Sequence, residues 1–151
     1  MITEPSAARI IDVVRDHLRG SIRPVLEDPA LVGLVDLIDS VLSGVGVRCE
    51  HEVGWMHEEI ALTKAVARKV VESGADEDGR VAEAMEALAA MPRSAVALPA
   101  VRVEYQLATE ALSRSLEVVT RRRSELTSEV RAVLARRLEN EITVRGDFVA
   151  R

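Results

Sequence analysis

Residues 47–73 read VRCEHEVGWMHEEIALTKAVARKVVES, and they carry the clearest structural pattern in this chain. Within them, apolar or small side chains recur at alternating steps of four and three residues. This spacing predicts an amphipathic helix with a heptad seam. The seam consists of Cys49, Val53, Met56, Ile60, Thr63, Ala67 and Val70.

Helical spacing continues on both sides of this segment. Ser6 is the predicted N-cap of a first helix that runs to about Arg19, with Gly20 at its end. Asp28 and Pro29 predict the start of a second helix, which Gly44 and Gly46 stop. The inner faces of these two helices are predicted to hold Ile10, Val13, Val14 and Leu18, and then Leu31, Leu34, Val35, Ile38, Val41 and Leu42.

The second half of the chain predicts two or three more helices. A short helix follows the acidic run 76–79, with Val81, Met85 and Leu88 inward, and Pro92 closes it. Residues 99–140 form a last helical region that is either one helix or two. We favour a break or kink near residues 121–124, with Ser124 or Ser128 as the cap, because an unbroken helix would extend roughly 60 Å.

Composition bounds the fold and the function. The chain has 151 residues, of which 48% are hydrophobic but only 2% aromatic, so small aliphatic side chains must build the core. That composition favours close helix packing. We therefore predict an all-α, antiparallel up-and-down bundle of five or six helices in one domain, residues 1–151, with loose ends at 1–5 and 146–151.

Charge and targeting signals exclude several classes. The net charge of −5 argues against nucleic-acid binding, which needs cations to neutralise phosphates. No stretch reaches the roughly 18–20 apolar residues that span a bilayer, and no signal peptide is evident. A single cysteine fits a reducing cytosol. The arginine-rich, lysine-poor composition suggests a GC-rich bacterial genome, so we expect a bacterial, cytoplasmic protein.

The residues with most chemical potential lie in the segment 50–59. Helical geometry predicts that Glu52 and Glu59, seven residues apart, point inward, while His51 and His57 face different sides. His17 lies in the apolar arc of the first helix. An inward carboxylate needs a partner, or else it stays protonated.

Three interpretations of these glutamates are open. In the first, Glu52, Glu59, His17 and His57 form a metal site in the bundle core, which would make the chain a metal- or ligand-binding enzyme. The usual Glu-x-x-His and His-Glu-x-x-His patterns are absent. In the second, which we favour, one glutamate pairs with Arg123 or another arginine. In the third, the glutamates reach solvent.

Other side chains have simpler interpretations. Cys49 lies in the seam and is predicted to be a buried, inert thiol. Trp55 and Leu62 widen the apolar arc of their helix, so they are the predicted interface residues of a homodimer formed through this helix or the last one. No catalytic residue and no cofactor is predicted.

The N-terminal stretch Pro5-Ser-Ala-Ala-Arg-Ile-Ile-Asp-Val-Val-Arg-Asp-His-Leu-Arg, followed by Ile22-Arg-Pro-Val-Leu-Glu, resembles a family of small, uncharacterised bacterial helical proteins. The resemblance covers about the first 45 residues. Family members usually have an aromatic residue where this chain has His17, which would make this position a packing slot. They are often encoded beside a phosphotransferase-fold kinase and an acyl-CoA dehydrogenase. The resemblance therefore implies an accessory partner of acyl-CoA or phosphotransfer enzymes, and a non-catalytic interaction protein is the function that we expect.

Overall fold

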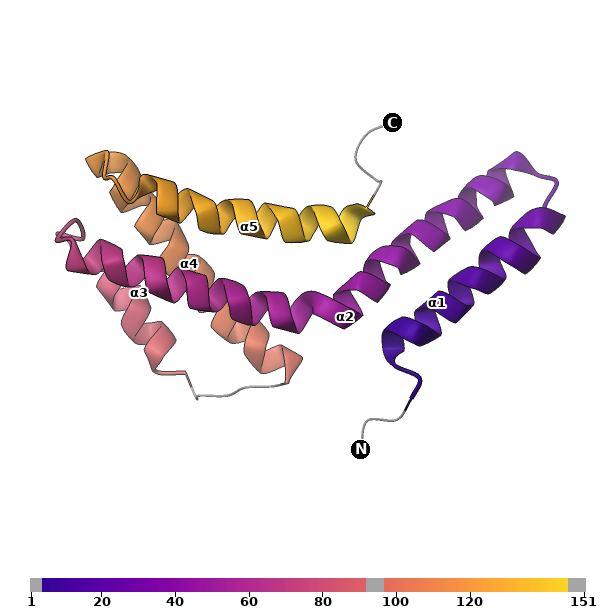
Figure 1. Cartoon of the computed structure of the whole chain (residues 1–151), viewed down its shortest axis with the longest axis horizontal. Helices are drawn as coiled ribbons and strands as arrows, with labels where there is room; N and C mark the ends of the chain where they lie inside the picture. Colours follow the sequence, from indigo (N-terminus) through magenta and orange to yellow (C-terminus); the bar gives the residue numbers. More distant parts are fainter. Residues whose placement is uncertain (1–3, 92–96, 147–151) are drawn as a thin grey trace. The chain divides into compact units, whose positions relative to one another are not determined.

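The computed structural model describes residues 4–91 and 97–146 of this chain. Within these ranges it contains five α-helices and no strand, which confirms the predicted all-α bundle (Figure 1). Pro92 and most of the ends predicted to be loose lie outside the described residues. The helices are α1 (Ala7–His17), α2 (Pro29–Glu72), α3 (Arg80–Ala89), α4 (Leu98–Arg122) and α5 (Thr127–Arg145).

Both predicted N-terminal caps are confirmed. The Ser6 hydroxyl accepts a hydrogen bond from the backbone N–H of Arg9 at 3.2 Å. The Asp28 carboxylate accepts one from Ala30 at 2.8 Å. The predicted end of the first helix at Gly20 is wrong, because helical backbone continues past α1 in a π-helical turn, η1 (Leu18–Ile22), and a 3-10 turn, η2 (Arg23–Val25). These turns still satisfy the backbone groups that a helix end would leave unpaired.

The predicted stop at Gly44 and Gly46 is also wrong, since α2 runs through both glycines as one helix of 44 residues. A Cβ atom at Gly44 would lie 2.9 Å from the backbone oxygen of Val144 in α5. A Cβ atom at Gly46 would meet the Ile11 side chain at 3.6 Å. Glycine inside a helix costs only about 1 kcal/mol relative to alanine. At Gly44 the residue therefore permits a close approach of α5 rather than ending α2.

The last helical region is two helices, as we favoured. Arg123 adopts the left-handed conformation, with φ of 51°, and ends α4. The Ser124 hydroxyl then accepts a hydrogen bond from the backbone N–H of Leu126 at 3.2 Å. The second helix, α5, extends to Arg145 and so passes the predicted end near Asn140.

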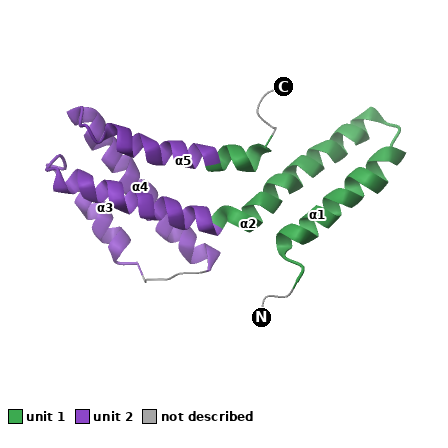
Figure 2. Cartoon of the chain, in the orientation of Figure 1, with its two compact units in different colours: residues 1–52, 140–151 green, residues 53–139 purple. Residues whose placement is uncertain are grey.

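The chain groups into two compact units (Figure 2). Unit 1 comprises Met1–Glu52 and Asn140–Arg151, and unit 2 comprises Val53–Glu139. Because α2 and α5 each run continuously through both units, this grouping does not decide whether the chain is one domain. The single domain stays a prediction.

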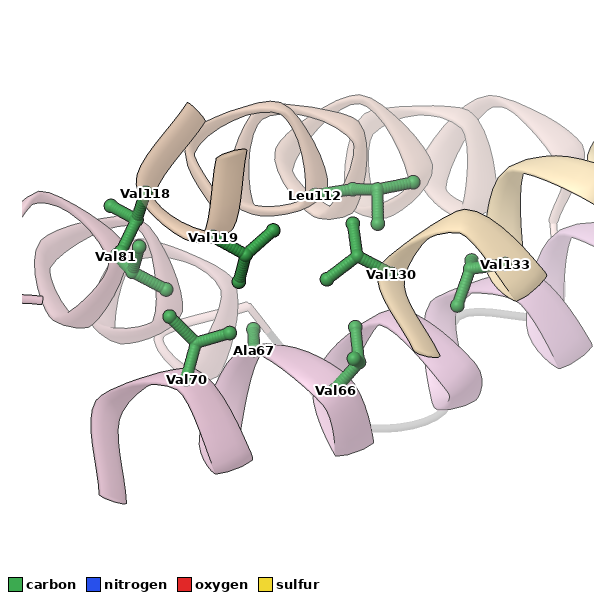
Figure 3. Packing of buried hydrophobic residues seen from close by; sticks show 9 residues of the cluster. All are labelled: Val66, Ala67, Val70, Val81, Leu112, Val118, Val119, Val130 and Val133. Carbon is green, nitrogen blue, oxygen red and sulfur yellow. The ribbon is translucent and has the colours of Figure 1, made fainter. Parts of the chain in front are cut away.

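Unit 2 contains an aliphatic core built from four helices. Figure 3 shows side chains of α2, α3, α4 and α5 converging on one another. Of the predicted seam, Ile60, Thr63, Ala67 and Val70 are buried, whereas Cys49 is exposed and its predicted burial is wrong. The core cluster consists of Val66, Ala67, Val70, Val81, Leu112, Val118, Val119, Val130 and Val133.

Unit 1 is a helical hairpin with the C-terminal end of α5. Arg15 and Arg19 contact Asp39, and Arg23 contacts Asp36. The residue numbers of the contacting pairs thus rise along one helix while they fall along the other. The first half of α2 therefore runs antiparallel to α1. The predicted inner face of the first helix is wrong, because Ile10, Val13 and Val14 are exposed.

Candidate functional site

The glutamates of residues 50–59 give the first candidate site, and it lies in unit 2. Glu59 is only 4% exposed, on α2. Its Oε2 atom accepts a hydrogen bond from the Tyr105 hydroxyl at 2.6 Å. The Arg137 guanidinium donates to the same oxygen from Nε at 3.0 Å. An arginine of the last helical region thus neutralises Glu59, as the favoured interpretation predicted.

Three further contacts join this network. Arg137 also donates to the Thr109 hydroxyl at 3.1 Å, and that hydroxyl donates to the backbone oxygen of Tyr105 at 2.9 Å. The guanidinium carbon of Arg137 lies 5.0 Å from the centre of the Tyr105 ring, within the range of a cation–π interaction. The four side chains come from α2, α4 and α5, so the network joins three helices. Buried networks of this kind fix the register of the helices that contribute to them.

The predicted partner Arg123 is not the one used. If α4 had continued, Arg123 would have fallen in its apolar stripe, but the chain turns there and Arg123 is exposed. Arg137 was missed because residues 136–137 resemble a solvated charged face. The available signal is its spacing from Val130 and Val133, since residues seven and four apart share one face of a helix.

The other predicted metal candidates do not gather around Glu59. His17 and His57 are exposed, and Glu52 is half-buried. Among residues 4–91 and 97–146, no three His, Cys, Asp or Glu side chains are grouped so that they could hold a metal ion. With Arg137 and Tyr105 on its carboxylate, Glu59 has the surroundings of a structural ion pair.

The predicted interface residues are partly available. Trp55 is half-buried, and Leu62 is 39% exposed. Most of the aliphatic side chains that are more exposed than Leu62 lie in unit 1.

The second candidate site is an apolar surface on the α1–α2 hairpin. Val35 is the one buried aliphatic side chain among the described residues of unit 1. Seven large aliphatic side chains in α1 and in residues 29–38 of α2 are between 39% and 51% exposed, and we call them the hairpin face. They are Ile10, Val13, Val14, Leu31, Leu34, Leu37 and Ile38.

Ion pairs join the two helices of the hairpin. Asp36 is held by Arg23, at 2.6 and 3.1 Å, and Asp39 by Arg15 and Arg19, at 3.1 and 2.6 Å. At 100° per residue, these acids lie roughly opposite the hairpin-face residues of α2. Because these ion pairs join α1 to α2, the exposed aliphatic residues of α2 point away from α1. Leu31, Leu34 and Ile38 are neighbours along this helix, and contiguous exposed aliphatic patches mark interaction surfaces.

These ion pairs predict that the stability of the hairpin depends on pH. The hydrogen bond from Arg23 holds the pKa of Asp36 below its ordinary value. Burial works to raise the pKa of Asp39, but hydrogen bonds from Arg19 and Arg15 outweigh it and lower that pKa. A depressed carboxyl pKa contributes stability above the unfolded value of about 4, and that contribution is lost as the pH falls through the folded pKa.

We therefore expect hydrogen-exchange protection of α1, corrected for intrinsic rates, to be constant at neutral pH and to fall below about pH 4. Asp39→Asn should lower this protection already at neutral pH. Asp16→Asn, at an exposed position of α1, is the control and should leave the protection of α1 unchanged. Equal protection of α1 in Asp39→Asn and in the unsubstituted chain would contradict the prediction.

The structure also corrects the expectation that no segment could span a bilayer. Helix α2 contains an 18-residue window with a mean hydropathy of 1.8, of which only 6% is buried. By length and composition alone, this window could cross a membrane. A core helix of a soluble protein passes the same test. The charges of Asp36 and Asp39 lie within this apolar part of α2.

Comparison with protein families, with curated proteins and with solved structures gives no match.

Proposed function

We propose that this chain is a non-catalytic interaction protein that forms a homodimer through the hairpin face. The observation that carries the proposal is the exposure of seven large aliphatic side chains on α1 and α2. Each such side chain contributes about 1.5–3 kcal/mol when it is fully buried. Because these side chains are not fully buried within one chain, their burial against a second chain would favour association.

The spacing on α2 favours a helix as the partner element. Leu31, Leu34 and Ile38 follow steps of three and four residues along α2. This is the repeat of a helix-packing seam. Two hairpins joined through such seams would form a four-helix arrangement, which is a common architecture for helical dimers.

Charge favours a second copy over a membrane. The acids Asp36 and Asp39 already have arginine partners within the hairpin, so two copies would bring no unpaired like charges together at the face. Entry into a bilayer would instead carry these pairs toward the hydrocarbon region. Charged groups at the centre of a bilayer cost about 2.5–3.5 kcal/mol each on insertion scales.

The resemblance of the N-terminal residues adds a possible hetero-partner, an acyl-CoA or phosphotransfer enzyme. We place the homodimer first because its support comes from the exposed side chains of this chain. The proposal includes the bacterial, cytoplasmic setting that the composition suggests. The alternative, a metal- or ligand-binding bundle enzyme, has no observation in its favour at Glu59.

Sedimentation velocity across the micromolar range tests the homodimer. We expect a dimer for the unsubstituted chain and at least a hundredfold weaker dimerisation for Leu34→Glu/Ile38→Glu, because a symmetric interface buries each substituted position twice. The matched control is Leu138→Glu/Ile142→Glu. It has the same residue types at the same spacing on an exposed face of α5, and it should leave dimerisation unchanged.

Three outcomes would overturn the proposal. A monomer at tens of micromolar would remove the dimer altogether. Loss of the dimer in the α5 control, with retention in the α2 variant, would move the interface to the last helix. Flotation of the chain with phosphatidylcholine vesicles, abolished by Leu34→Glu/Ile38→Glu, would identify the hairpin face as a membrane contact.

A further inference from the structure

A groove lies in unit 1 where the last residues of α5 approach α2. It has a volume of about 500 Å³, within the range of small-molecule sites. Its aliphatic wall is formed by Val41 and Val45 of α2 and by Val144 of α5. Val41 and Val45 are 56% and 40% exposed and are not part of the hairpin face as defined above.

The groove adjoins a polar pocket of about 350 Å³ in the same unit. Ser40, Val144 and Arg145 line both spaces, so the two are neighbours. The polar pocket is bordered by Arg15 and Arg19. We call these two neighbouring spaces, one aliphatic and one polar, the cleft.

Cations outnumber anions around this cleft. Arg15, Arg19, Arg48 and Arg145 line it, whereas Asp39 is the acid that lines it. Arg15 and Arg19 share Asp39, and Arg48 has only a long contact of 3.9 Å with Glu141. For Arg145 there is no ion pair or hydrogen bond of the side chain with any residue of 4–91 and 97–146. It lies at the junction of the two spaces, where its charge is available to a ligand.

We propose that this cleft binds an amphipathic anion with a single aliphatic chain, such as a medium-chain carboxylate. The chain lies against Val41, Val45 and Val144, and the head group accepts hydrogen bonds from Arg145. A guanidinium pairs with a carboxylate through two parallel hydrogen bonds, which also orient the ligand.

The close approach at Gly44 defines the shape of the cleft. Because any Cβ atom there would meet the Val144 backbone oxygen at 2.9 Å, α5 lies directly against α2 at this residue. The aliphatic wall beside this contact consists of short valine side chains, Val41, Val45 and Val144, and not of long, flexible ones. Valine has a restricted χ1 angle, so the wall is preorganised for an apolar ligand.

Isothermal titration calorimetry of the full chain with dodecanoate, below its micelle concentration, tests this site. We expect one dodecanoate per chain and at least tenfold weaker binding of dodecanol, which has the same chain without the charge. Inorganic phosphate and acetate, which lack the aliphatic chain, should not bind measurably.

Two substitutions separate the roles of charge and chain. Arg145→Gln should weaken dodecanoate about tenfold and leave dodecanol unchanged, since one charge-assisted contact is removed. Its control is Arg131→Gln, at an exposed arginine of the same helix for which no ion pair is found in the described part of the chain. Val45→Glu should weaken both ligands at least tenfold, and Val71→Glu, at an exposed position of the same helix, should not.

Circular dichroism of each variant verifies that it is folded. Equal affinity for dodecanoate and dodecanol would overturn the proposal, and so would dodecanoate binding that is insensitive to Arg145→Gln and Val45→Glu. Flotation with vesicles of phosphatidylcholine and phosphatidylserine, without binding of soluble dodecanoate, would assign the arginines to a membrane surface instead.

Discussion

We expect Arg137→Met to lower the free energy of unfolding by about 3 kcal/mol, measured by urea denaturation at neutral pH. The substitution keeps an unbranched side chain of similar length but removes the cation beside Glu59. That carboxylate is 4% exposed and accepts hydrogen bonds from both Arg137 and Tyr105 on one oxygen. Removing one partner of a buried pair leaves the other charge insufficiently compensated, and this costs more than the pair itself contributes.

A double-mutant cycle distinguishes this cause from lost packing. Glu59→Leu/Arg137→Met removes both charges and should recover much of the stability lost in Arg137→Met. Arg131→Met is the matched control on the exposed side of α5 and should change the free energy of unfolding by less than about 0.5 kcal/mol. If Arg137→Met were as stable as Arg131→Met, the network would be incidental to the fold.

The inward direction of Glu59 could be predicted from the sequence because it depends only on helical geometry. Residues seven apart face one way, and the seam from Ile60 to Val70 is buried as predicted. Its partner could not be predicted in the same way. Arg137 belongs to a different helix, and the identity of a cross-helix partner depends on where α4 ends, which the left-handed turn at Arg123 decides.

The hairpin shows a second reason why the sequence was insufficient. Periodicity identifies an apolar face, but it does not say whether that face meets the rest of its own chain. Ile10 and Leu34 were placed on inner faces by their spacing, and both are about half exposed. Cys49 was placed in the buried seam for the same reason and is exposed. The glycines at 44 and 46 misled the prediction of helix ends because glycine also serves close packing within a helix.

The second large effect is expected at Leu112. It is 2% exposed and is the one leucine in a core cluster that otherwise consists of valine and alanine. Leu112→Ala should lower the free energy of unfolding by about 3 kcal/mol, because it removes buried apolar surface and leaves a cavity. Urea denaturation followed by circular dichroism measures it. Leu138→Ala, at a leucine that is 61% exposed, is the control and should have an effect below about 0.5 kcal/mol.

The same experiment reveals how stability is distributed along the chain. Unit 2 holds nearly all of the buried aliphatic residues, whereas Val35 is the one in the described part of unit 1. Leu34→Ala in the hairpin should therefore leave the unfolding of a dilute, monomeric sample almost unchanged, while Leu112→Ala shifts it. At concentrations where the dimer forms, Leu34→Ala should become destabilising, because association stabilises the folded chain by mass action. If Leu34→Ala strongly lowered the free energy of unfolding of the monomer, this side chain would be buried within its own chain. The hairpin face would then not be a surface for a partner.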